Sequence, residues 1–158
     1  MTWPGKPEVI AAFKADAEGA LATAERAQSI AQNEATSDES KAEGKYDTRA
    51  TEASYLARGQ ADRVIQLRAV VAWFDGFNAS TPHDIVGLGS LVTLKSAHDQ
   101  TLLVCPVGGA KLTIKNTVIR ALSLAAPLGR AIAGLEEGDD CSVVVGAKRA
   151  DYLVTRLR

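Results

Sequence analysis

Two stretches of sequence decide the fold: IAAFKADAEGALATAERAQSIA at residues 10–31 and YDTRATEASYLARGQADRVIQLRAVVAWF at residues 46–74. Each carries small or apolar residues at alternating three- and four-residue steps, which is the spacing of a coiled-coil seam. The first seam is Ile10, Phe13, Ala17, Ala20, Ala24, Ala27 and Ala31; the second is Tyr46, Ala50, Ala53, Ala57, Gln60, Val64, Leu67, Val71 and Phe74.

The two seams mirror each other when the chain is folded back on itself. The facing pairs are Ile10 with Phe74, Phe13 with Val71, Ala17 with Leu67, Ala20 with Val64, and Ala31 with Ala53, and each pair of numbers adds to 84. A constant sum over many turns predicts an antiparallel helical hairpin over residues 8–35 and 46–77, with its apex near residue 42. At 1.5 Å rise per residue, arms of about 25 to 28 residues reach roughly 40 Å.

The second half of the chain has a different character. The helical period ends in GFNASTPHD at residues 76–84, whose Gly, Asn, Ser, Pro and Asp are typical of a linker. In APLGRAIAGLEEGDD, Pro127 fits the start of a short helix and Gly134 its end. Strand-like runs are Leu91 to Ser96, Thr101 to Pro106, Lys111 to Ile114, Val118 to Leu124, Asp140 to Val145 and Tyr152 to Leu157.

These patterns predict an α+β protein with two domains. We expect a coiled-coil hairpin in residues 1–78, with an acidic tip near residues 38–47. A linker follows at residues 79–84, and residues 85–158 form a small, mostly antiparallel β domain with one short helix.

Composition excludes several classes of function. A net charge of -1 and a pI near 6.1 give no general reason to bind nucleic acid or an acidic membrane surface. No stretch approaches 18 consecutive apolar residues, and the N-terminal MTWPGKPEVI lacks an apolar signal core. We therefore expect a cytoplasmic protein with no membrane partner.

The cysteines and histidines predict no metal site held by the chain alone. Cys105 and Cys141 lie in Val- and Leu-rich runs, where cysteine is usually a small buried hydrophobe. No C-x-x-C pair is present, and His83 and His98 lie in loop-like segments away from any cluster. We expect no cofactor of the protein's own.

The stretch APLGRAIAGLEEGDDCSVVV at residues 126–145, after GSLVTL and before DYLVTRL, resembles the C-terminal domain of the bacterial Gre transcript-cleavage factors (GreA and GreB). Members typically carry a SPLGRAL-type turn and a G-x-x-x-GD step. The tip segment KAEGKYDTRATEAS at residues 41–54 also resembles the acidic tip of that family, including its tyrosine. Ala126 replaces the serine that usually caps the helix.

The resemblance implies a fold and a mechanism. Gre factors have an antiparallel coiled coil followed by a domain similar to FK506-binding proteins. Their coiled coil enters the secondary channel of RNA polymerase, and acidic tip residues help to hold a second magnesium ion at the polymerase active site. The polymerase then cleaves backtracked RNA, because paired cations stabilise the attacking and leaving oxygens. The factor itself is not an enzyme.

Carried onto this chain, the resemblance implies specific residues. Asp38, Glu39 and Glu43 would act at the tip inside the polymerase, and Glu39 and Glu43 would share the polymerase-held Mg²⁺. The turn formed by Ala126, Pro127, Leu128 and Gly129 would dock on the rim of the channel. RNA polymerase is then the partner, contact with transcript RNA is indirect, and the factor is a monomer.

One departure at the tip keeps a second hypothesis open. With Tyr46 aligned, the aspartate of the family falls on Glu39, but its glutamate falls on Ala42, and Glu43 comes one residue later. One residue rotates a helix by about 100°, so the shift matters. The alternative is a regulator that occupies the channel without stimulating cleavage.

Two further hypotheses need no polymerase chemistry. The acidic tip could be a solvated loop, with Tyr46 closing the hairpin, and the whole chain could be a coiled-coil adaptor for another protein.

Two enzyme-like features are disfavoured. A prolyl isomerase needs a pocket walled by aromatic side chains, and Tyr152 is the only aromatic residue in residues 79–158, so it cannot line such a pocket alone. GGAK at residues 108–111 weakly resembles a phosphate loop, and a tight turn explains it better.

Overall fold

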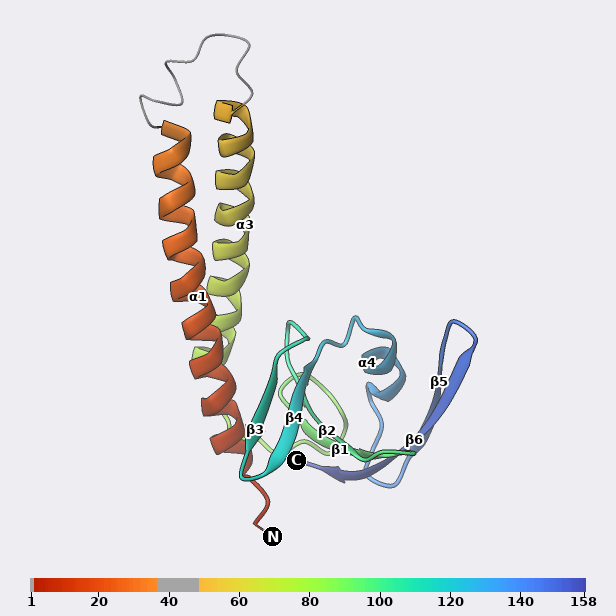
Figure 1. The fold of residues 1–158 in the computed structure, drawn as a ribbon. Helices are drawn as coiled ribbons and strands as arrows, with labels where there is room; N and C mark the ends of the chain where they lie inside the picture. Colours follow the sequence, from red (N-terminus) through yellow and green to blue (C-terminus); the bar gives the residue numbers. More distant parts are fainter. Residues whose placement is uncertain (1, 37–48) are drawn as a thin grey trace. The chain divides into compact units, whose positions relative to one another are not determined.

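The structure, a computed structural model, describes residues 2–36 and 49–158 (Figure 1). Helices α1 (Lys6–Thr36) and α3 (Arg49–Gly76) precede six strands and one short helix, which confirms the predicted α+β organisation. The chain forms two compact units: Lys14–Asp75 is one, and residues up to Phe13 join Gly76–Arg158 in the other. The first turns of α1 therefore belong to the unit that contains the strands. The predicted linker at residues 79–84 stays a prediction.

The two long helices pair in antiparallel orientation (Figure 1). Lys14 Nζ lies 2.6 Å from Asp75 Oδ1, and Arg68 Nη2 lies 3.2 Å from Glu25 Oε1, so rising numbers on α1 meet falling numbers on α3. One apolar cluster contains Ala24, Val64 and Leu67, with Ala20 and Leu21 packed against it. Ala20 and Val64, a predicted facing pair, therefore lie in the same cluster.

Burial follows the predicted seams. Every seam residue from Ile10 to Ala31 and from Ala53 to Phe74 is buried or half-buried. The bulk lies away from the tip, where Val64 and Phe74 are 1% and 5% exposed. The burial of these larger side chains supplies most of the apolar stabilisation of the helical pair.

The strands form one mixed sheet in the order β3-β4-β2-β1-β6-β5. All neighbouring strands are antiparallel except β2 and β4, which run parallel with Thr101 opposite Ile119. The sequence predicted all six strands but not this parallel pair. The bounds are β1 Leu91–Lys95, β2 Gln100–Val104, β3 Lys111–Ile114, β4 Thr117–Leu122, β5 Asp140–Val145 and β6 Lys148–Leu157.

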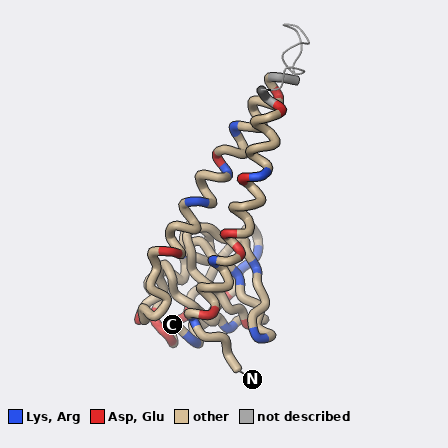
Figure 2. The backbone as a smooth tube through the Cα atoms, turned by 90° about the vertical axis from the view of Figure 1, so that its left-hand side faces the viewer, with Lys and Arg blue, Asp and Glu red and all other residues tan. Residues whose placement is uncertain are grey.

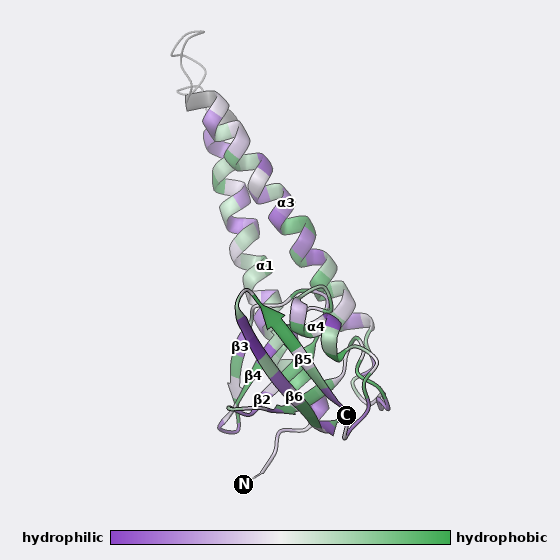
Figure 3. Cartoon of the chain, turned by 90° about the vertical axis from the view of Figure 1, so that its right-hand side faces the viewer, coloured by the Kyte–Doolittle hydropathy of each residue, from purple (hydrophilic) through white to green (hydrophobic). Residues whose placement is uncertain are grey.

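Apolar side chains of the strand unit are buried on both faces of this sheet. Helix α4 (Pro127–Ile132) contributes Ile132, which is fully buried. The cluster consists of Val86, Val92, Leu94, Leu102, Val104, Ile132 and Val154. Leu103 and Ile119 point to the other face, because side chains alternate along a strand, and they are also fully buried. Figure 3 shows both hydrophobic and hydrophilic residues along the strands.

The start of α1 is tied to the strand unit by an ion pair. Glu8 Oε2 lies 2.9 Å from Lys115 Nζ in the turn between β3 and β4. Val9, the next residue, is fully buried.

No helix in residues 2–36 or 49–158 combines the length and the apolar character needed to cross a bilayer.

Candidate functional site

The predicted tip lies outside the described residues. Asp38, Glu39 and Glu43 fall between Thr36, the last residue of α1, and Arg49, the first residue of α3. Ala42, Tyr46 and the neighbouring Lys41, Lys45 and Asp47 fall there as well. The predictions made for these residues therefore stay predictions.

The helices that lead to the tip are held together by small residues. On α1, Ala24 and Ala31 are 7% and 2% exposed, and on α3, Ala53 and Ala57 are half-buried. Small side chains at a helix interface let the two axes approach closely, whereas typical interaxial distances are about 8–10 Å. The alanines on both helices are thus of the size that a close approach of the two axes requires.

The outer surface of the helical pair combines scattered charges with exposed apolar side chains. Acidic and basic residues alternate along both helices without a large patch of one sign (Figure 2). Four large apolar residues stand outside the seams: Ile30, Tyr55, Leu56 and Ile65 are 60%, 64%, 51% and 63% exposed. None of them was predicted to be functional, although bulk at non-seam positions of an Ala-rich helix is a visible signal in the sequence.

The turn for which the family resemblance implies polymerase binding is built around Ser123 and Gly129. The backbone N–H of Ala126 donates to Ser123 O at 3.1 Å, and that of Ala125 donates to Ser123 Oγ at 3.1 Å. A Cβ at Gly129 would lie 2.1 Å from Ser123 O, so a glycine is required there. Ala126 begins α4 without a side-chain cap, and Pro127 occupies the first turn, as predicted.

The four predicted rim residues differ in accessibility. Pro127 is exposed, Ala126 and Leu128 are half-buried, and Gly129 is buried. Leu128 packs against the core of the strand unit. Arg130, which was not among the predicted site residues, is exposed, and its Nε donates to Ala125 O at 2.9 Å. Pro127 and Arg130 are thus the side chains of this turn that a partner can reach.

The GLEEGDD segment that follows α4 has a structural role at each of its motif positions. Gly134 has a φ of +80°, and its N–H donates to Val86 O at 2.8 Å. Gly138 has a φ of +97°, and its N–H donates to Val154 O at 2.7 Å. Asp139 Oδ2 accepts from Glu136 N at 2.9 Å. These bonds join the segment after α4 to the segment before β1 and the turn before β5 to β6, so the motif has a structural role in this unit.

A buried lysine forms a second cluster of polar groups in the strand unit. Lys6, only 6% exposed, donates through Nζ to Thr81 O and to His83 Nδ1, both at 2.7 Å. His83 Nε2 donates to Leu88 O at 3.1 Å, which assigns the histidine proton to Nε2. The ring of Phe77 lies 5.5 Å from Lys6 Nζ. Sequence reasoning missed this cluster, because Lys6 and His83 are 77 residues apart and no local pattern links them.

Burial sets the titration of this cluster. It lowers the pKa of Lys6 to about 8, since the charged ammonium is poorly solvated there. Burial, and next the charge of Lys6, lower the pKa of His83. No carboxylate among the described residues forms a salt bridge with Lys6. Its hydrogen bonds to Thr81 and His83 join the start of α1 to the segment before β1, and we call this cluster the Lys6–His83 clamp.

Both cysteines lie where burial disfavours the thiolate form. Burial raises the pKa of the Cys105 thiol to about 11 and raises the pKa of Cys141 as well. Within residues 2–36 and 49–158, no group of three or more His, Cys, Asp or Glu side chains is arranged to hold a metal ion. Tyr152 is half-buried against the apolar core, so it does not wall an open pocket.

Comparison with known proteins finds similarity among solved structures only. No protein-family model and no curated protein sequence matches the chain. The GreA factor homolog 1 (Gfh1) protein of Thermus thermophilus is 18% identical over 98% of this chain and 94% of that chain, with a TM-score of 0.37. Gfh1 of Thermus aquaticus is 19% identical over 96% and 92%, with a TM-score of 0.38.

A third similar structure is the prokaryotic transcription elongation factor GreA/GreB from Nitrosomonas europaea. It is 17% identical over 68% of this chain and 91% of that chain, with a TM-score of 0.35. These three structures thus bear the names of GreA/GreB or of a GreA homolog.

Proposed function

We propose that the chain is a Gre-like transcription elongation factor that binds RNA polymerase and inserts its helical pair into the secondary channel. The observation that carries this proposal is a long helical pair with an alanine seam, followed by a small sheet. The sequence between the two helices resembles the tip of Gre factors, and PLGRAI and GLEEGD in the second half of the chain resemble their C-terminal domain. In this proposal the polymerase performs the chemistry, and the factor modulates it.

The dimensions of the helical pair suit a narrow cleft. Helix α1 has 31 residues and α3 has 28, which correspond to lengths of about 46 Å and 42 Å. The seam near the tip contains Ala24, Ala31 and Ala57 rather than bulky residues, so the end of the pair is slender. Such a pair can carry a few side chains deep into a channel that a globular domain cannot enter.

The tip supplies the chemistry in this proposal. Asp38, Glu39 and Glu43 carry carboxylates, which are the ligands that Mg²⁺ prefers, and the ion keeps several waters while it shares carboxylates with phosphate groups. Exposed carboxylates alone bind it weakly. We therefore expect the metal to be shared only in the complex, where the polymerase holds the ion as well.

The turn at the start of α4 supplies a second contact in this proposal. Pro127 and Arg130 are exposed and adjacent on a short, well-anchored helix. Leu128 and Gly129 support the turn from within the unit. A rim contact formed by this helix would orient the factor while the helical pair enters the channel.

The experiment compares neutralised carboxylates at two places on the helical pair. The tip variant carries Asp38→Asn, Glu39→Gln and Glu43→Gln. The control carries Asp62→Asn, Glu18→Gln and Glu52→Gln, which make the same charge change on exposed residues outside the tip. Binding to RNA polymerase and cleavage of RNA in backtracked complexes are measured for the wild type and both variants.

The two readouts separate the hypotheses. Cleavage that is stimulated by the wild type and the control, but not by the tip variant, supports the proposal. Binding without stimulated cleavage in the wild type supports the channel-occupying regulator and points to Ala42 as the cause. A chain that does not bind RNA polymerase at all contradicts both, and the adaptor hypothesis then takes their place.

A further inference from the structure

Two like charges lie directly opposite each other on β3 and β4. Lys111 pairs with Arg120 in the antiparallel register, so both side chains leave the same face of the sheet. The Cβ atoms of such a pair are about 5 Å apart, and like charges at that spacing destabilise a sheet. Among the described residues, neither cation has an ion-pair or hydrogen-bond partner. The folded chain thus tolerates a repulsive pair, and neither member of it forms an ion pair with a described residue.

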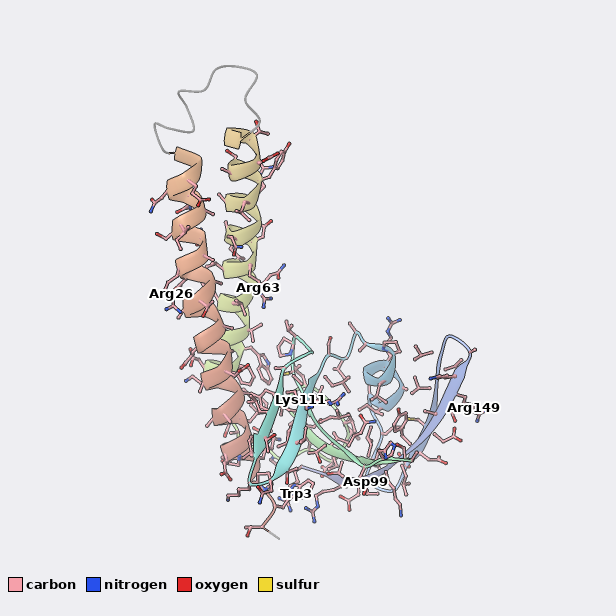
Figure 4. All side chains as sticks on the ribbon, in the orientation of Figure 1. Trp3, Arg26, Arg63, Asp99, Lys111 and Arg149 are labelled. Atoms are coloured by element: carbon pink, nitrogen blue, oxygen red, sulfur yellow. The ribbon has the colours of Figure 1, made fainter. Side chains whose placement is uncertain are left out.

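The two cations line an open cleft with a volume of about 480 Å³. We call this the cation cleft; its residues are His98, Asp99, Gln100, Thr101, Lys111, Val118 and Arg120. Asp99 is the one carboxylate that lines it, so the cleft carries a net positive charge when His98 is neutral. Lys111 and Asp99 are labelled in Figure 4.

The glycines before Lys111 place it there but do not form a phosphate loop. Gly109 has a φ of +107°, and its N–H donates to Ala121 O at 3.2 Å, so this donor is already used. A Cβ at Gly108 would lie 3.1 Å from Ser123 N. The GGAK segment is therefore a tight turn, and its functional consequence is the side chain of Lys111 beside Arg120.

The cleft has the chemistry of a phosphate site. A phosphate monoester carries a charge of about -1.5 to -2 at pH 7, which is opposite in sign to the net charge that Lys111, Arg120 and Asp99 give the cleft. The planar guanidinium of Arg120 can bind two phosphate oxygens at once, and the ammonium of Lys111 adds a point charge. Sites for small molecules occupy about 300–1,000 Å³, so the cleft has room for a group joined to the phosphate.

We propose that the cation cleft binds a phosphate monoester, with the phosphate between Lys111 and Arg120. Val118, which is 44% exposed, offers an apolar wall for the organic part of the ligand. Gln100 and Asp99 offer hydrogen-bonding groups beside it. The phosphate belongs to a small molecule such as a nucleoside monophosphate or to the phosphorylated end of an RNA strand. This site is independent of the tip and of polymerase binding.

The test is a titration of the full chain with adenosine monophosphate, adenosine and inorganic phosphate, followed by NMR. The variant is Lys111→Met with Arg120→Gln, and the control is Lys148→Met, which removes an exposed cation at the first residue of β6. We expect saturable shifts at Lys111, Arg120 and His98 with the monophosphate, about tenfold weaker binding for each lost cation, and unchanged binding in the control.

A second measurement does not depend on knowing the ligand. In phosphate-free buffer, Lys111→Met alone should raise the melting temperature, because it removes the cross-strand repulsion. Added phosphate should raise the melting temperature of the wild type more than that of Lys111→Met. RNA oligonucleotides with and without a 5′ phosphate then identify the source: preference for the phosphorylated strand assigns the RNA end. Equal binding of adenosine and its monophosphate, or equal loss in the Lys148→Met control, overturns the proposal.

Discussion

Lys6 Nζ lies 2.7 Å from His83 Nδ1, and the ammonium donates to a histidine that must stay neutral to accept. The contact joins the first turn of α1 to the segment before β1, within the strand unit. It places a buried cation beside a group that becomes a cation in acid. The stability of this unit should therefore depend on the protonation of both groups.

The first prediction concerns pH. Both folded-state pKa values are lowered, so the unfolded chain binds more protons and stability rises with pH. For His83, stability is lost as the pH falls below the ordinary value of 6.5; for Lys6, it is gained between about 8 and 10.5. Thermal unfolding across this range should show the gain above pH 8 in the wild type and not in Lys6→Met.

The control for this prediction is Lys95→Met, which removes an exposed lysine at the end of β1. It should keep the wild-type pH profile. The pKa of His83, followed by NMR, should rise in Lys6→Met, because the repulsion from the ammonium is gone. An identical pH profile for Lys6→Met and the wild type contradicts the clamp.

The second prediction compares two leucines of α3. Leu67 is 7% exposed in the cluster with Ala24 and Val64, so Leu67→Ala should reduce the free energy of unfolding by about 2–5 kcal/mol. Leu56 is 51% exposed, and Leu56→Ala should change it by less than about 0.5 kcal/mol. Chemical denaturation followed by far-ultraviolet circular dichroism measures both. Equal effects would show that the seam does not pack as described.

The third prediction compares two glycines. Gly129→Ala places a methyl group against Ser123 O, and such overpacking should reduce the free energy of unfolding by about 1–3 kcal/mol. Gly59 lies inside α3, where a methyl group added at its Cα would meet no atom within 4 Å, so Gly59→Ala should increase it by about 0.5–1 kcal/mol. Thermal melts of both variants show whether each one raises or lowers the stability. An unchanged stability of Gly129→Ala would refute the close approach of Gly129 to Ser123 O.

The fourth prediction concerns the turn at the start of α4. If this turn contacts the polymerase, Pro127→Ala combined with Arg130→Gln should weaken binding by about tenfold, because both exposed side chains are lost. Val144→Ala, a change at a residue of β5 that is 66% exposed, should leave binding unchanged. Unaltered affinity of a folded double variant contradicts this contact. Leu128 is a poor probe, since it packs against the core.

Local pattern predicted most of the elements. The seams predicted the burial of residues such as Ala31 and Val64, and Pro127 and Gly134 marked the ends of α4, because helix periodicity and turn chemistry act over a few residues. The long-range arrangement was not predictable in the same way. The parallel pairing of β2 with β4 and the bond between Lys6 and His83 depend on the folded topology.

The residues of the candidate sites were also predictable only where local sequence decides them. The family resemblance pointed to Pro127, which is exposed, and equally to Gly129, whose role is structural. Sequence alone did not separate them, because accessibility depends on packing with Ser123. The pairing of Lys111 with Arg120 was also hidden, since a cross-strand register is needed to bring two distant cations together.

The central claim is that the tip of the helical pair enters the RNA polymerase channel, and the most direct measurement locates the tip in the complex. An iron chelate attached at Ala42→Cys, with a second at the exposed Ala72 near the other end of α3 as control, cuts polymerase peptides nearby. Both labelled proteins carry Cys105→Ser and Cys141→Ser, so that the introduced thiol is the only one that reacts. We expect cuts beside the polymerase active site from Ala42→Cys and cuts only at the channel entrance from Ala72→Cys. Cuts from the tip that fall on the outer surface of the polymerase, or no cuts despite binding, would contradict the claim.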